Sequence, residues 1–159
     1  MKPKVYVETT VISYYTAKPS NDIFLLARQR VTEQWWSHAV QNLSLFISEA
    51  VIEEAREGDK VAAAKRLEHL NKMPSLEINE DTTKIYQIYI KELPIPPKAH
   101  RDALHIAVAS IHGMDYIVSW NCKHIANGFI IKKIMEINTR LGIPVPVIVT
   151  PDELLEESK

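Results

Sequence analysis

The chain has 159 residues, of which 46% are hydrophobic and 25% charged, a composition typical of one globular domain with a hydrophobic core. A formal net charge of −1 argues against a strongly basic protein that coats nucleic acid. The single cysteine, Cys122, excludes an intramolecular disulfide, and no stretch approaches the roughly 18 apolar residues of a membrane span. Because residues 1–8 also lack an apolar signal region, we expect a cytoplasmic protein without a membrane-spanning segment.

Strand-like and helix-like segments alternate along the chain. Short apolar segments predict strands at Val5–Val7, Leu43–Ser48, Leu76–Ile78, Tyr116–Ser119 and Val145–Val149. Helical patterns lie between them, at approximately Asp22–Val40, Glu49–Glu57, Lys60–Lys72, Asp81–Lys91, His100–His112 and Lys123–Thr139. This alternation predicts parallel strands joined by helical crossovers. The expected fold is one domain, residues 1–159, forming a three-layer α/β/α sandwich around a parallel sheet of about five strands.

Acidic or amide residues stand close to the ends of three strands and at the start of one helix. Glu8 ends the first strand, Glu53 and Glu54 lie beyond the second, Asp102 opens a helix and Asn121 follows the fourth strand. In open parallel sheets, ligands bind outside the carboxyl ends of the strands, where the strand order reverses. This rule predicts that these side chains share one site.

Each of these residues also has an interpretation that needs no ligand. Glu8 would be favourable near the N-terminus of a following helix, which Thr9 or Thr10 is suited to cap. Glu53 and Glu54 lie about a hundred degrees apart on a helix, so we expect one to face inward and the other to be solvated.

Asp102 begins a helix that is apolar on nearly every face, so its carboxylate needs a backbone cap, a cation or a metal as partner. His105 shares its face and is interpreted as a hydrogen-bonded interior or supporting residue rather than a ligand. The other histidines have no zinc-like spacing: His38, His69, His100, His112 and His124. Asn121 is either a cap for a helix beginning near Lys123 or a neutral oxygen ligand.

Three carboxylates brought together repel one another unless a cation is present. Oxygen ligands of this kind suit Mg²⁺ or Mn²⁺ better than zinc or copper. Such a cluster activates water and holds a scissile phosphate in many metal-dependent nucleases.

In its motifs and their order, the chain resembles the PIN domain family, and within it the VapC-type toxins. The resemblance covers nearly the whole chain and rests on four segments, whose letters are VYVETTVIS (5–13), ISEAVIEE (47–54), DALHIAVA (102–109) and YIVSWN (116–121). It implies an α/β/α sandwich and a Mg²⁺- or Mn²⁺-dependent ribonuclease. The acidic positions of the family fall on Glu8, Glu54, Asp102 and Asn121, which are the expected metal ligands and catalytic residues.

The resemblance also implies an RNA substrate, a cognate antitoxin protein as partner and the toxin role of a toxin–antitoxin pair. Glu8 is one methylene longer than the aspartate typical of its position, and Asn121 replaces a carboxylate by an amide. These departures leave a second interpretation open, a catalytically weakened or inactive PIN-fold module that binds RNA or protein. A small-molecule-binding domain unrelated to nucleases is a third.

Two further features bear on partners. Adjacent Trp35 and Trp36 cannot share one helical face, which indicates either one core and one half-exposed residue or a surface for a homodimer or other partner. Six basic side chains could form a rim for a phosphate backbone or simply be solvated: Arg28, Arg30, Lys123, Lys132, Lys133 and Arg140.

Overall fold

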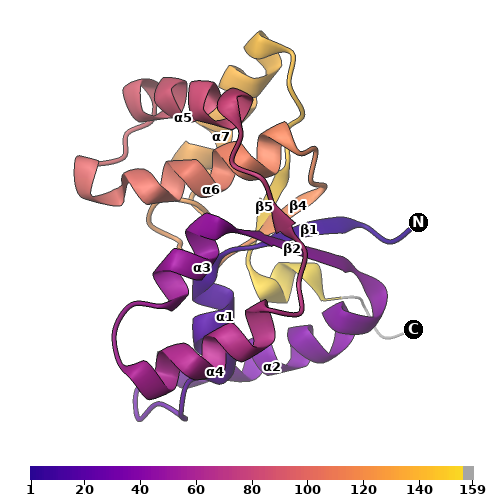
Figure 1. Ribbon diagram of the computed structural model, residues 1–159, viewed down its shortest axis with the longest axis vertical. Coiled ribbons are helices and arrows are strands. Elements are labelled where there is room, and N and C mark those ends of the chain that lie inside the picture. Colours follow the sequence, from indigo (N-terminus) through magenta and orange to yellow (C-terminus); the bar gives the residue numbers. More distant parts are fainter. Residues whose placement is uncertain (156–159) are drawn as a thin grey trace.

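The structure is a computed structural model, and residues 1–155 are described here. Its centre is a sheet of five parallel strands in the order β3-β2-β1-β4-β5. The strands are β1 (Lys4–Val7), β2 (Ser44–Ser48), β3 (Ser75–Leu76), β4 (Tyr116–Val118) and β5 (Val147–Val149). Figure 1 shows them between two groups of helices. The predicted α/β class with a parallel five-stranded sheet is confirmed.

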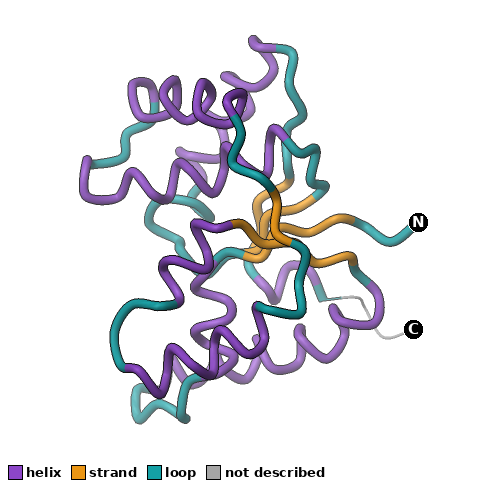
Figure 2. Tube along the Cα trace, viewed as in Figure 1, coloured by secondary structure: helices purple, strands orange, loops and turns teal. Residues whose placement is uncertain are grey.

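The helices form the outer layers. They are α1 (Thr9–Thr16), α2 (Ile23–Asn42), α3 (Glu49–Ala55), α4 (Lys60–Leu70), α5 (Glu80–Glu92), α6 (His100–Ile111) and α7 (Gly128–Leu141), with short 3-10 turns at Pro97–Ala99 and Pro151–Leu154. Helices α5, α6 and α7 lie on one side of the strands, and α1, α2 and α4 lie on the other (Figures 1 and 2).

The central strand β1 explains why the sheet needs both layers. Val5, Tyr6 and Val7 are all fully buried, so side chains on both faces of β1 are covered by helices. From β1 the chain continues to the neighbouring strand β2 and then to β3 at one edge of the sheet. It then returns to add β4 and β5 on the opposite side of β1. The strand order therefore reverses at β1. The carboxyl ends of β1 and β4 flank the position where ligands bind in such sheets.

Local signals place several helix ends. Asp22 caps α2 by accepting hydrogen bonds from two backbone N–H groups, and Gly142 ends α7 with a φ of 68°. The predicted start of the last long helix near Lys123 is wrong, because α7 begins at Gly128 behind the capping residue Asn127. Residues 122–126 instead form an irregular turn at the end of the β4 segment.

The adjacent tryptophans are both buried, contrary to the interpretation that one is half-exposed. Trp35 is 0% and Trp36 6% exposed. Tyr15 of α1 stacks on Trp36 with ring centroids 4.5 Å apart, and His69 of α4 contacts both rings edge-on. The tryptophans thus join α1, α2 and α4, and they do not form an exposed surface for a partner.

Candidate metal centre

Glu8 directly follows β1 and is almost completely buried, with 2% of its surface exposed. It occupies the N-cap position of α1, but its side chain forms no capping hydrogen bond. Instead, Oε1 accepts hydrogen bonds from the hydroxyls of Thr10 and Ser119, each at 2.5 Å. Because Ser119 directly follows β4, residues from both central strands hold this carboxylate at the crevice. Glu8 therefore belongs to the site and is not a helix cap.

Glu54 is the inward-facing member of the adjacent pair on α3, while Glu53 is exposed. Its Oε1 accepts a hydrogen bond from the Thr9 hydroxyl at 2.8 Å and bonds to Nε2 of His105. Its Oε2 lies 3.8 Å from the guanidinium of Arg101.

The two threonines after β1 thus orient the two glutamates. Thr9 donates to Glu54, and Thr10 donates to Glu8 while its hydroxyl oxygen accepts the backbone N–H of Trp120 at 2.8 Å. Their expected role as helix caps is not the one that the structure shows, since the N-cap position belongs to Glu8.

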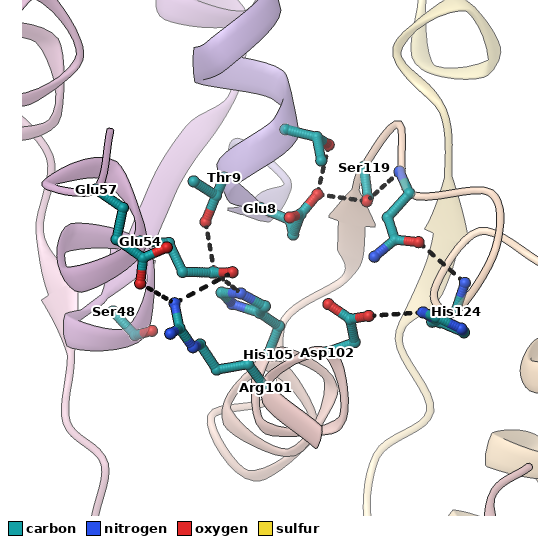
Figure 3. Close-up of polar contacts among 12 residues, drawn as sticks. Glu8, Thr9, Ser48, Glu54, Glu57, Arg101, Asp102, His105, Ser119 and His124 are labelled. Atoms are coloured by element: carbon teal, nitrogen blue, oxygen red, sulfur yellow. Dashed lines mark hydrogen bonds and ion pairs between the residues drawn. The ribbon is translucent and has the colours of Figure 1, made fainter. Parts of the chain in front are cut away.

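His105 connects Glu54 to the sheet. It is fully buried, and its Nδ1 lies 2.6 Å from the hydroxyl of Tyr6, which lies 2.8 Å from the hydroxyl of Ser48. We call Glu54, His105, Tyr6 and Ser48 the Glu54 side of the centre. One ligand atom from each of Glu8, Glu54 and His105 lies within 4.8 Å of the other two, a grouping that can hold a metal ion (Figure 3).

Asp102 lies in the first turn of α6, where its Oδ2 is 3.0 Å from Nδ1 of His124. The side-chain oxygen of Asn121 accepts the backbone N–H of His124 at 2.9 Å. We call Asp102, His124 and Asn121 the Asp102 side of the centre. Of the two interpretations of Asn121, this hydrogen bond supports the capping one, although the capped segment is the turn at 122–126 and not α7.

Burial and neighbouring charges shift the pKa values of Glu8, Glu54 and His105. Burial raises the pKa of Glu8, although His105, Ser119 and Thr10 partly oppose the shift. Burial would also raise the pKa of Glu54, but the hydrogen bond and charge of His105, with Thr9 and Arg101, hold it below its ordinary value. Burial would lower the pKa of His105, but Glu54 above all, followed by Glu8 and Asp102, raises it.

The donor chemistry fits a cation. In Glu8 and Asp102, one carboxylate oxygen is held by neighbouring hydrogen-bonding groups. In Glu54, Oε1 is held by Thr9 and His105, and Oε2 forms a longer ion pair of 3.8 Å with Arg101. Supporting hydrogen bonds of this kind orient carboxylates that bind metals. In Figure 3 the three carboxylates come from α6, α3 and the end of β1 around one region. The raised pKa of buried Glu8 also indicates that its negative charge is poorly compensated by its neighbours, and a bound cation would compensate that charge.

The imidazole of His105 is less available to a cation than the carboxylates. Both ring nitrogens are engaged, one by Tyr6 and one by Glu54. A cation that bound Nε2 would have to displace the carboxylate of Glu54 from it. Among residues 1–155, the side chains whose ligand atoms converge are those of Glu8, Glu54 and His105, and Asp102 does not belong to that group.

The four predicted site residues do not all lie in one group. Glu8 and Glu54 belong to the potential metal-binding group, whereas Asp102 and Asn121 are linked to each other through His124. From the sequence alone, the spacing of His124 indicated no zinc site, and Tyr6, Ser119 and Arg101 were not predicted as site residues. Ser119 could have been found, because it ends the fourth predicted strand level with Glu8.

Neither a scan against models of protein families nor a search of curated protein sequences finds a match to this chain. Within residues 1–155, the helices are too short or too polar to cross a lipid bilayer.

Proposed function

We propose that the protein is an endoribonuclease that uses a divalent cation, Mg²⁺ or Mn²⁺, held by the carboxylates of Glu8, Glu54 and Asp102. The observation that carries this proposal is the burial of Glu8 at the point where the strand order reverses. One ligand atom from each of Glu54 and His105 lies within 4.8 Å of a carboxylate oxygen of Glu8. Carboxylate oxygens favour Mg²⁺ or Mn²⁺, and the engaged nitrogens of His105 make zinc a poorer fit.

When bound, the cation would supply a polarised phosphate oxygen and an activated water. The chain's own contribution is orientation. Thr10 and Ser119 fix one oxygen of Glu8, and Thr9 fixes one oxygen of Glu54, so both carboxylates are oriented before any ligand arrives. This preorganisation lowers the cost of assembling the transition state.

The choice of RNA as substrate, the toxin role and a cognate antitoxin partner rest on the resemblance to PIN domains of the VapC type. A single-stranded phosphodiester also suits the centre physically, because its anionic oxygens need a cation among these carboxylates. Asn121 in this proposal orients the turn that carries His124, and it can add a neutral oxygen at the edge of the site.

The test measures cation binding and RNA cleavage together. Titration calorimetry with Mn²⁺ should give one saturable site in the wild type, and mixed single-stranded RNA should be cleaved with Mn²⁺ or Mg²⁺. Glu54→Gln and Asp102→Asn should each lower the cleavage rate by about 100-fold or more, as losses of charged groups at catalytic centres do.

Glu53→Gln is the matched control, because Glu53 is the exposed neighbour of Glu54 on the same helix. It should retain wild-type cleavage and wild-type Mn²⁺ affinity. Equal cleavage by all four proteins would refute the catalytic proposal. The absence of a saturable Mn²⁺ site, together with no cleavage of any RNA, would favour the binding module instead.

A further inference from the structure

The basic side chains singled out in the sequence are not equivalent in the structure. Three of them are neutralised by nearby carboxylates: Arg30 by Glu33, Lys133 by Glu136 and Arg140 by Glu92, at 3.2, 3.8 and 2.6 Å. Within residues 1–155, no carboxylate forms an ion pair with Arg28, Lys123 or Lys132. Of these three, only Arg28 is held in place by an aromatic ring.

Arg28 projects from α2 so that the carbon of its guanidinium lies 5.2 Å from the ring centroid of Trp120. Its Nη2 also lies 3.9 Å from the sulfur of Cys122. Trp120 is itself fixed, because its indole N–H donates to the hydroxyl of Thr32 at 2.7 Å and its ring meets Tyr14 edge-on. A stacked guanidinium loses less conformational freedom when it binds a ligand than a free side chain does.

Trp120 connects this guanidinium to the segment that holds Glu8. The preceding residue, Ser119, donates its hydroxyl to Glu8, and the backbone N–H of Trp120 donates to Thr10, which also donates to Glu8. Two hydrogen-bonded links therefore join the backbone of Trp120, whose ring lies under Arg28, to the buried carboxylate. An anion bound by Arg28 would lie at the rim of the site.

We propose that Arg28, stacked on Trp120, binds a backbone phosphate of the substrate strand beside the scissile phosphate. This inference deepens the proposed nuclease function and depends on it. Phosphate is the expected ligand because the planar guanidinium matches its oxygens with paired N–H donors, and because no neighbouring carboxylate competes for Arg28 among the described residues. The contact would be independent of base identity and of the 2′-hydroxyl.

The test uses binding and not turnover, so that it is separate from catalysis. Fluorescence anisotropy measures the affinity of the full chain for a labelled single-stranded RNA oligonucleotide with Ca²⁺ in place of Mn²⁺, because oxygen ligands also bind Ca²⁺. The same measurement is made with single-stranded DNA of the same sequence. Arg28→Gln should weaken both by about 10-fold, the size of effect expected for one charge-assisted hydrogen-bonded contact at a partly exposed site. The slope of log affinity against log salt concentration should fall by about 0.7, as expected for one lost contact to a single strand.

Arg30→Gln is the matched control, because it removes an arginine two residues away on the same helix that is already paired with Glu33. It should leave affinity and salt slope within error of the wild type. Arg28→Lys should lose part of the affinity, since lysine keeps the charge but not the planar stacking group. Thermal unfolding of each variant identifies any loss that comes from the fold.

The outcomes separate this inference from the proposed function. If Arg28→Gln binds RNA as tightly as the wild type while the wild type cleaves RNA, the Arg28 contact is refuted and the nuclease stands. If Arg30→Gln weakens binding as much as Arg28→Gln, the effect is general charge and the specific contact is refuted. If the wild type binds Mn²⁺ but binds neither single-stranded RNA nor single-stranded DNA, both the Arg28 contact and the choice of nucleic acid as substrate are refuted.

Discussion

The two sides of the centre are built from different kinds of structure. The residues of the Glu54 side lie on β1, on α3 and α6, and at the end of β2, and they form a continuous chain of hydrogen bonds from Ser48 to Glu54. On the Asp102 side, His124 lies on the irregular turn at 122–126. Its side chain is 15% exposed against 0% for His105, although the order is reversed for the carboxylates, with 14% for Asp102 and 21% for Glu54. We infer that the Glu54 side keeps its geometry without a ligand, whereas the Asp102 side can adjust when one binds.

The largest expected effect comes from breaking each side at its histidine. His105→Leu removes the partner of a partly buried carboxylate and leaves the Tyr6 hydroxyl without one of its two bonds, so we expect a loss of about 3 kcal/mol in the free energy of unfolding. His124→Leu removes one hydrogen bond at a more exposed position and should cost about 1 kcal/mol. Urea unfolding at pH 6 measures both.

The identical substitution at both positions makes each variant the control for the other. Equal losses of stability would contradict the distinction between a fixed and an adjustable side. A larger loss for His124→Leu would reverse it.

A second prediction uses pH to isolate the ion pair of the Glu54 side. The pKa of His105 is raised in the fold, so its contribution to stability is complete below its ordinary value of 6.5 and is lost as pH rises through the raised value. The pKa of Glu54 is lowered, so its contribution is present above its ordinary value of 4.5 and is lost as pH falls through the lowered value. The stability difference between wild type and His105→Leu should therefore be greatest between pH 4.5 and 6.5.

Unfolding free energies measured from pH 3 to pH 9 check this window. The difference between wild type and His124→Leu serves as the reference, since that substitution leaves the bond between Glu54 and His105 intact. A difference for His105→Leu that stays constant over the whole range would show that packing, and not the ion pair, explains the loss.

The sheet was predictable because its signals are local. The β-branched and aromatic run Val5–Val7 identifies the central strand, and alternation with helical patterns determines that the strands are parallel. The last helix was placed too early because its periodic pattern continues upstream of Asn127. The cap at Asn127 and the competing turn capped by Asn121 together show that the helix starts later.

The centre was predictable only in part, because its details depend on contacts between distant segments. The ends of strands indicated Glu8, and the fold rule connected it to Glu54. The bond between Tyr6 and His105 joins residues 99 positions apart, and no spacing in the sequence encodes it. The same holds for Asp102 and His124, whose pairing follows from the path of the turn after β4.

The smallest expected effect tests Asn121 and, with it, how far the Asp102 side can adjust. Asn121→Asp keeps the oxygen that accepts the N–H of His124, so the free energy of unfolding should stay within about 0.5 kcal/mol of the wild type, whereas Asn121→Ala should lose about 1 kcal/mol. If the Asp102 side can turn toward a cation, the added charge should raise the Mn²⁺ affinity about two- to five-fold in calorimetry, the range for one extra charge near the surface. Unchanged affinity together with retained stability would leave Asn121 a capping residue alone. The Asp102 side would then contribute to metal binding through Asp102 only. Cleavage by the wild type would have to depend on the carboxylates of Glu8, Glu54 and Asp102, without a fourth oxygen ligand.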